Sequence, residues 1–124
     1  MGEWLFEWAK SELGEAVVGM TFERFSKWLP VKRVKETKKV IAFWHPKPFW
    51  EKHVVIVPKK AIRSLMKLRN EDDVYVAEVF RVAREIVEEL GWDKEEYTLL
   101  VNGGRRQKIA QIHWHLSQGE QIKN

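Results

Sequence analysis

The residues best able to do chemistry lie near the end of the chain, where one residue separates two histidines in Gln111-Ile112-His113-Trp114-His115-Leu116. If residues 109–116 form an extended strand, successive side chains point to opposite faces. Gln111, His113 and His115 then share one face, and the apolar side chains between them share the other. Burial of the apolar face would hold two imidazoles at a fixed spacing, and a neutral imidazole near pH 7 acts as a nucleophile, a base or a metal ligand.

An isolated histidine pair of this kind is more often a half-solvated surface than a site. The rest of the chain therefore has to decide between the two interpretations. The sequence contains 4 His and 0 Cys. Disulfides, thiol catalysis and cysteine-based zinc sites are thus excluded, and histidine is the only strong nitrogen ligand or neutral-pH base.

The elements that must position these histidines follow from the apolar patterning. Strands are predicted over residues 31–36, 40–44, 53–57, 97–101 and 109–116. A broad apolar face over residues 71–90, followed by Gly91, predicts the main helix. We also predict a short helix over residues 61–68, a turn at residues 102–104 and a mobile polar tail over residues 118–124. This order predicts a single α+β domain with a five-stranded, mostly antiparallel sheet and one long helix.

The first 29 residues form a separate part of the prediction. Amphipathic patterns over residues 3–13 and 21–28 predict two short helices. We place an N-terminal helical extension at residues 1–29, packed on a domain of residues 30–124.

Composition narrows the class of protein. With 124 residues, of which 44% are hydrophobic, the chain has apolar material for one domain. No apolar run reaches the roughly 18 residues of a membrane span, and no signal peptide is recognisable, so we expect no membrane association and a cytoplasmic location. The formal net charge of +4 favours anionic partners. The densest basic run, residues 32–39, is interrupted by Glu36 and is more typical of a solvated edge strand than of a nucleic-acid-binding stripe.

Several segments match one family in order and spacing: residues 30–36, 40–43, 48, 53–60, 101–104 and 107–116. In these segments, which span residues 30–119, the chain resembles the histidine triad (HIT) superfamily, and specifically the branch of histidine triad nucleotide-binding proteins. The family motif is His-φ-His-φ-His-φ-φ, where φ is apolar. Here it reads Gln111-Ile112-His113-Trp114-His115-Leu116-Ser117, so glutamine replaces the first histidine.

The resemblance implies a catalytic role for the motif. His113 matches the histidine that attacks the α-phosphate of a nucleotide and forms a nucleotidyl-histidine intermediate. His115 is implied to contact the phosphate and assist the leaving group, and His53 matches a further histidine that neighbours the first triad member. Gln111 takes that first position, and its main-chain carbonyl is expected to fix the tautomer of His113.

The resemblance also implies a set of nucleotide-binding residues. His45 stands at the position where many members carry a ribose-binding aspartate. A neutral imidazole has neither the negative charge nor the two acceptor oxygens of a carboxylate. Lys108 replaces a serine that assists the leaving group. Asn102 is implied to lie near the phosphate, Phe43 to line the base pocket, and Gln107 to complete the set.

These residues lead to one favoured function and several alternatives. The favoured function is a hydrolase or nucleotidyl transferase acting on a nucleoside phosphoramidate or a phosphoanhydride such as a dinucleoside polyphosphate, with no required cofactor and no metal. The alternatives are a catalytically reduced nucleotide-binding module, a nucleic-acid-binding protein, which is less favoured, and a zinc site of His53, His113 and His115. The resemblance further implies a purine nucleotide or nucleotide conjugate as the ligand and a homodimer as the assembly.

Overall fold

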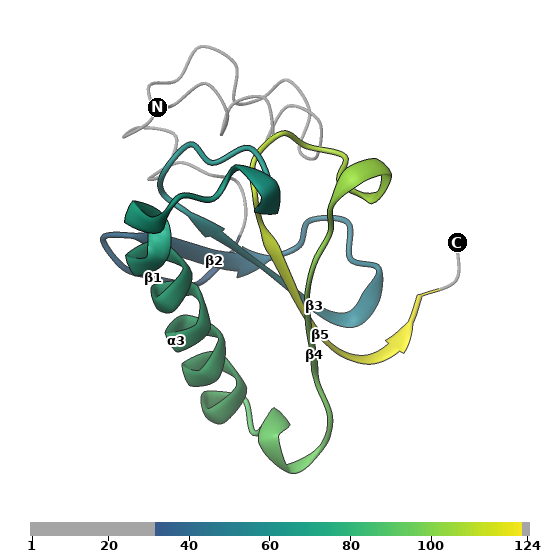
Figure 1. The fold of residues 1–124 in the computed structure, drawn as a ribbon. Coiled ribbons are helices and arrows are strands. Elements are labelled where there is room, and N and C mark those ends of the chain that lie inside the picture. The colour runs from purple at the N-terminus through teal and green to yellow at the C-terminus, as the bar shows by residue number, and fades with distance from the viewer. Residues whose placement is uncertain (1–31, 123–124) are drawn as a thin grey trace.

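The structure, a computed structural model, describes residues 32–122. These residues form a five-stranded sheet that one long helix covers on one face (Figure 1). The helix is α3 (Asp73–Glu89). The strands are β1 (Arg33–Glu36), β2 (Val40–Trp44), β3 (Trp50–Pro58), β4 (Thr98–Val101) and β5 (Trp114–Gln121). Their spatial order is β1-β2-β3-β5-β4, and every neighbouring pair is antiparallel. The predicted α+β class with one long helix is confirmed.

The core lies between α3 and one face of the sheet. Strand alternation sends Val54 and Ile56 of β3 toward the helix, together with Trp114 and Leu116 of β5. The apolar side of α3 meets them with Val79, Val82, Ala83, Ile86 and Val87, which are all buried. Each fully buried aliphatic side chain contributes about 1.5 to 3 kcal/mol to folding. This layer therefore fixes β3 and β5, the two central strands that carry His53 and His115.

The final strand begins later than the sequence predicts. Residues 109–113 are not part of a strand, and β5 starts at Trp114, paired with Ile56. The main-chain N–H of Ile112 instead donates to the carbonyl of Ile62 at 2.7 Å. The predicted mobile tail is wrong over residues 118–121, since β5 continues there and pairs Gln121 with Trp50.

The predicted short helix over residues 61–68 is also wrong. Only a single 3-10 turn forms, Leu65–Lys67, and the residues on either side of it, Ser64 and Leu68, have extended backbones. The main chain at Lys60 and Ile62 bonds to Gln111 and Ile112 rather than to itself. These long-range partners outcompete a local helix. The predicted turn after β4 leads into another 3-10 turn, Gly104–Arg106, in which Gly104 has a positive φ of 59°.

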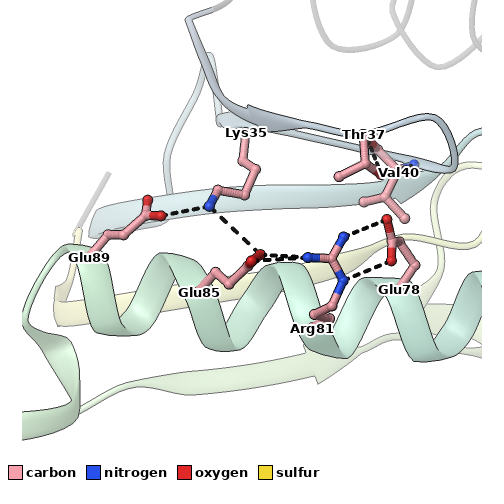
Figure 2. Close-up of polar contacts among 7 residues, drawn as sticks. All are labelled: Lys35, Thr37, Val40, Glu78, Arg81, Glu85 and Glu89. Atoms are coloured by element: carbon pink, nitrogen blue, oxygen red, sulfur yellow. Dashed lines mark hydrogen bonds and ion pairs between the residues drawn. The ribbon is translucent and has the colours of Figure 1, made fainter.

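Two cations of the basic run, Arg33 and Lys35 of β1, form ion pairs with acidic side chains. Figure 2 shows Lys35 of β1 reaching α3, where its Nζ lies 2.6 Å from Glu89 and 3.7 Å from Glu85. Arg81 on the same helix bonds both Glu78 and Glu85 (Figure 2). The hydrogen bond to Glu89, together with the charges of Glu85 and Glu89, raises the pKa of Lys35. The contacts tie the edge strand β1 to the helix.

Two other predictions concern the ends of the chain and the membrane. The predicted extension over residues 1–29 lies outside the described residues. Within residues 32–122, no helix has the length and apolar character that crossing a bilayer requires.

Candidate active site

Four histidines gather on the sheet face that points away from α3. His45 follows β2, His53 belongs to β3, His113 immediately precedes β5, and His115 belongs to β5. The ring centroids of His45 and His53 lie 4.5 Å apart, those of His53 and His115 5.0 Å apart, and those of His113 and His115 4.9 Å apart. All four side chains are buried. The spacing of one residue between His113 and His115 therefore does place both rings in one cluster.

The ring of His113 is oriented by the main chain two residues upstream. Its Nδ1 atom lies 2.8 Å from the carbonyl oxygen of Gln111. A carbonyl oxygen only accepts a hydrogen bond, so Nδ1 carries the proton. In the neutral ring the lone pair then resides on Nε2, the nitrogen that can attack an electrophile.

His53 sets the opposite polarity on His115. The main-chain N–H of Phe49 donates to Nδ1 of His53 at 3.1 Å, so a neutral His53 carries its proton on Nε2. That atom lies 2.8 Å from Nδ1 of His115 and donates to it. The proton of a neutral His115 is consequently on Nε2. His113 thus has an electron pair on Nε2, whereas His115 has a hydrogen-bond donor there.

His45 is oriented in the same way by a turn of its own loop. The main-chain N–H of Lys47 donates to Nδ1 of His45 at 2.9 Å, which puts the proton of the neutral ring on Nε2. The His45 ring stacks on His53 with an interplanar angle of 22°. His45 is therefore, like His115, a hydrogen-bond donor through Nε2.

Burial keeps these imidazoles uncharged. It lowers the pKa of His45 and of His115 to about 4 and that of His53 to about 3, and neighbouring imidazoles lower each of them further. Burial also lowers the pKa of His113, although its hydrogen bond to the Gln111 carbonyl acts in the opposite direction. All four rings are neutral at pH 7, as the tautomers derived from the hydrogen bonds require.

A small cavity opens beside three of the four imidazoles. Its volume is about 160 Å³, and it is lined by His45, Phe49, Asn102, Arg106, Lys108, Ile109, His113 and His115. No carboxylate from residues 32–122 lines it. Two cations, Arg106 and Lys108, and side chains with N–H donors thus line the same cavity as His113, which is a suitable arrangement for a phosphate group.

The structure brings most of the sequence-predicted residues to this cavity, but not all. His53 lies behind His115 and contacts it rather than Gln111. Phe43 is fully buried and does not line the cavity. Gln107 lies to one side, where its amide donates to the carbonyls of Arg63 at 2.6 Å and Ile109 at 2.9 Å.

Gln111 acts through its backbone rather than through its side chain. The side chain is 1% exposed and turns away from the cavity. Its Oε1 accepts from the N–H of Ile62 at 3.1 Å, and its Nε2 donates to the carbonyl of Lys60 at 2.9 Å. These bonds hold the segment on which the carbonyl partner of His113 sits. Gln111 is therefore a positioning residue.

Sequence reasoning missed Phe49, Arg106 and Ile109. Phe49 packs against three imidazoles, with ring centroids 5.0 Å from His45, 5.2 Å from His53 and 6.5 Å from His115. Its place after Pro48, four residues before His53, was the only available signal. Arg106 and Ile109 belong to the loop after the glycine pair, whose course a sequence pattern does not define.

The nitrogen atoms of His53 bear on the zinc alternative. Both are engaged, one with the N–H of Phe49 and the other with His115. Within residues 32–122, no group of three or more His, Asp or Glu side chains is arranged to hold a metal ion. Within the cluster a hydrogen bond joins His53 to His115, and ring contacts join His45 to His53 and His113 to His115.

Comparison with known proteins agrees with this geometry. A sequence profile of the HIT domain matches residues 27–122. A HIT-like protein of Helicobacter pylori is 26% identical over 94 residues, which is 74% of this chain and 88% of that protein. The adenosine 5′-monophosphoramidase of Candida albicans is 31% identical over 96 residues, which is 71% of this chain and 61% of that protein.

Solved structures give the same result. A histidine triad protein from Clostridium difficile superposes with a TM-score of 0.72 at 26% identity, covering 82% of this chain and 90% of that one. A HIT family hydrolase from Legionella pneumophila superposes with a TM-score of 0.71 at 27% identity, covering 79% and 89%. Since the family profile spans most of the sequence and the fold agrees with these structures, the chain belongs to the HIT domain family.

Proposed function

We propose that the protein is a nucleotidyl hydrolase or transferase that cleaves a nucleoside phosphoramidate or phosphoanhydride of a purine nucleotide. The proposal rests on one observation above all, the 2.8 Å contact between Nδ1 of His113 and the carbonyl of Gln111. This contact places the lone pair of a neutral imidazole on Nε2, and His113 lines a cavity that also has two cations in its lining. The similarity to a protein named as an adenosine 5′-monophosphoramidase supports a phosphoramidate as one substrate class.

In the first chemical step, Nε2 of His113 forms a bond to the α-phosphorus as the bond from phosphorus to the leaving atom breaks. The leaving atom takes the electron pair of the broken bond. A phosphate leaves as an anion without a proton, whereas an amine leaves with a proton taken from solvent. The modified ring keeps its Nδ1 proton, and the carbonyl of Gln111 stabilises the positive charge that the ring acquires.

In the second step, water attacks phosphorus, the bond to Nε2 breaks and His113 returns to its neutral form. The water loses one proton to solvent. A different acceptor in place of water would make the reaction a nucleotidyl transfer. Around the phosphorus, the Nε2–H of His115 and the side chains of Asn102, Arg106 and Lys108 would donate to the phosphate oxygens, whose negative charge the two cations offset.

Turnover of adenosine 5′-phosphoramidate tests the proposal. The wild-type protein should release AMP, and His113→Ala should reduce kcat by about 10³-fold or more because the nucleophile is lost. Lys94→Ala is the matched control, since Lys94 is exposed and lies outside the cavity lining. If wild type and His113→Ala are equally inert while both bind AMP, the protein is a nucleotide-binding module instead.

We also propose that the protein is a homodimer that joins through α3 and β4. Support comes from the position of β4 at the edge of the sheet. A groove of about 430 Å³ runs along α3 and β4 and is lined in part by Phe80, Val87 and Leu99. Phe80 and Tyr97 in this groove are 53% and 54% exposed. Light scattering should give twice the monomer mass for wild type and the monomer mass for Phe80→Glu, and a monomeric wild type would contradict the assembly.

A further inference from the structure

A second hollow lies directly beside the candidate active site. Its volume is about 460 Å³, and it is lined by Arg63, Ser64, Met66, Lys67, Gly104, Gln107, Lys108, Ile109 and Ala110. Lys108 and Ile109 also line the cavity of His113. The 3-10 turns that border the second hollow, Leu65–Lys67 and Gly104–Arg106, lie at the end of the sheet where β5 begins (Figure 1). The two hollows are therefore neighbours with a common wall.

The charged side chains that line the second hollow are all positive. Arg63, Lys67 and Lys108 are exposed and line it, and no Asp or Glu from residues 32–122 does. Within the described residues, none of these three cations has a carboxylate at ion-pair distance, in contrast to Lys35 and Arg81, which are paired. Unpaired like charges around one hollow repel each other and attract an anion. The chemistry of the hollow is that of an anion site.

The small volume of the cavity beside His113 indicates that the anion in the second hollow is another part of the same substrate. A site that encloses a whole small-molecule ligand usually measures about 300 to 1,000 Å³. The cavity beside His113 measures about 160 Å³, which accommodates a phosphate group but not an entire nucleotide conjugate. Other parts of the substrate must lie outside it, and Lys108 connects it to the larger, cationic hollow.

We propose that the hollow of Arg63, Lys67 and Lys108 binds the leaving group of the substrate and that this leaving group is a chain of phosphates. The inference rests on the proposed nucleotidyl chemistry at His113. In this reaction Nε2 of His113 bonds to the α-phosphorus, and the bond from that phosphorus to the bridging oxygen breaks. The bridging oxygen keeps the electron pair and departs as the end of a polyphosphate anion, so no proton donor is needed. The cations stabilise the charge that develops on it, which favours a phosphoanhydride over a phosphoramidate with an uncharged amine.

The test compares two substrates in charge variants of Lys67. The ratio of kcat/KM for di(adenosine) tetraphosphate to kcat/KM for adenosine 5′-phosphoramidate should fall about tenfold in Lys67→Glu and by a smaller factor in Lys67→Gln. Lys94→Glu changes an exposed lysine that lines neither hollow, so it should leave the ratio unchanged. A ratio that Lys67→Glu does not change would overturn the assignment, and so would an equal fall in Lys94→Glu.

A binding measurement separates this inference from the proposed function. Inorganic tripolyphosphate is titrated calorimetrically into His113→Ala protein, which has no proposed nucleophile. Its affinity should fall about tenfold when Lys67→Glu is added, and it should weaken as sodium chloride is raised. A wild-type protein that cleaves neither substrate would contradict the proposed function. The anion site would still be supported if tripolyphosphate binds and Lys67→Glu weakens that binding. Tripolyphosphate binding that is undetectable or insensitive to Lys67→Glu would overturn the anion site itself.

Discussion

Replacing Gln111 by methionine is expected to lower the free energy of unfolding by about 2 to 4 kcal/mol. Methionine is close to glutamine in length and volume, so the change removes hydrogen bonds without opening a large cavity. The side chain is 1% exposed. Water therefore cannot replace the bonds that are lost.

Within residues 32–122, the side chain of Gln111 makes three hydrogen bonds, and the magnitude follows from the two shorter ones, because the third, from Nε2 to the carbonyl of Pro58, is 3.4 Å long. Oε1 of Gln111 accepts from the N–H of Ile62 at 3.1 Å, and Nε2 donates to the carbonyl of Lys60 at 2.9 Å. Each buried main-chain group without a partner costs about 1 to 3 kcal/mol, and the better burial of methionine offsets part of the sum. The same loss would loosen the carbonyl that holds His113, so we expect kcat of the folded protein to fall as well.

Urea unfolding followed by circular dichroism measures the effect, and Gln118→Met is the matched control. Gln118 bonds the exposed Glu95 at 3.3 Å, so the same exchange there should change stability by less than about 0.5 kcal/mol. If the two variants lose equal stability, the Gln111 side chain is not the internal tie inferred from its hydrogen bonds.

Three further predictions concern charge. Burial depresses the folded-state pKa of His45, His53 and His115, so the unfolded chain binds more protons than the folded one below about pH 6.5. As the pH falls from 7 to 5, each of these histidines should therefore lower the free energy of unfolding by up to about 2 kcal/mol. Equal urea midpoints at the two pH values would contradict this. Because burial lowers the pKa of His113, the loss of kcat/KM for a phosphoramidate on acidification should begin at a lower pH than for a histidine of ordinary pKa, and a pH profile whose midpoint lies at the ordinary histidine pKa would contradict this. Lys35→Ala should cost less than about 1 kcal/mol in urea unfolding, because its ion pairs lie at the surface, and a loss as large as that of Gln111→Met would contradict that ranking.

The sequence predicted the fold where burial determines the pattern. One buried layer contains Val54 and Ile56 of β3, the alternating Ile112, Trp114 and Leu116, and the broad apolar face of α3, and the sequence pattern indicated each of these. Alternation also predicted that His113 and His115 would share a face, although β5 begins only between them. Residue 113 follows the alternation because Ile112 is anchored in the core on its other side.

The sequence pattern does not predict contacts between segments that lie far apart in the chain. Gln111 was expected to act beside His53, but its side chain bonds residues 60 and 62, about fifty positions away in the chain. The helix expected over residues 61–68 does not form, because the main chain of Ile62 bonds Gln111 and Ile112 instead of its own neighbours. Phe49 and Arg106 lie on loops, where no periodicity indicates the direction of a side chain.

Trapping the covalent intermediate tests the role of His113 most directly. The protein is mixed with adenosine 5′-phosphoramidate, quenched within the first turnover in alkaline denaturant, digested and analysed by mass spectrometry. An adenylyl group should be found on His113 in the wild-type protein, and no adenylated peptide should be found in His113→Ala. Turnover without an adduct on His113, or an adduct on His53 or His115 instead, would contradict the assignment of the nucleophile.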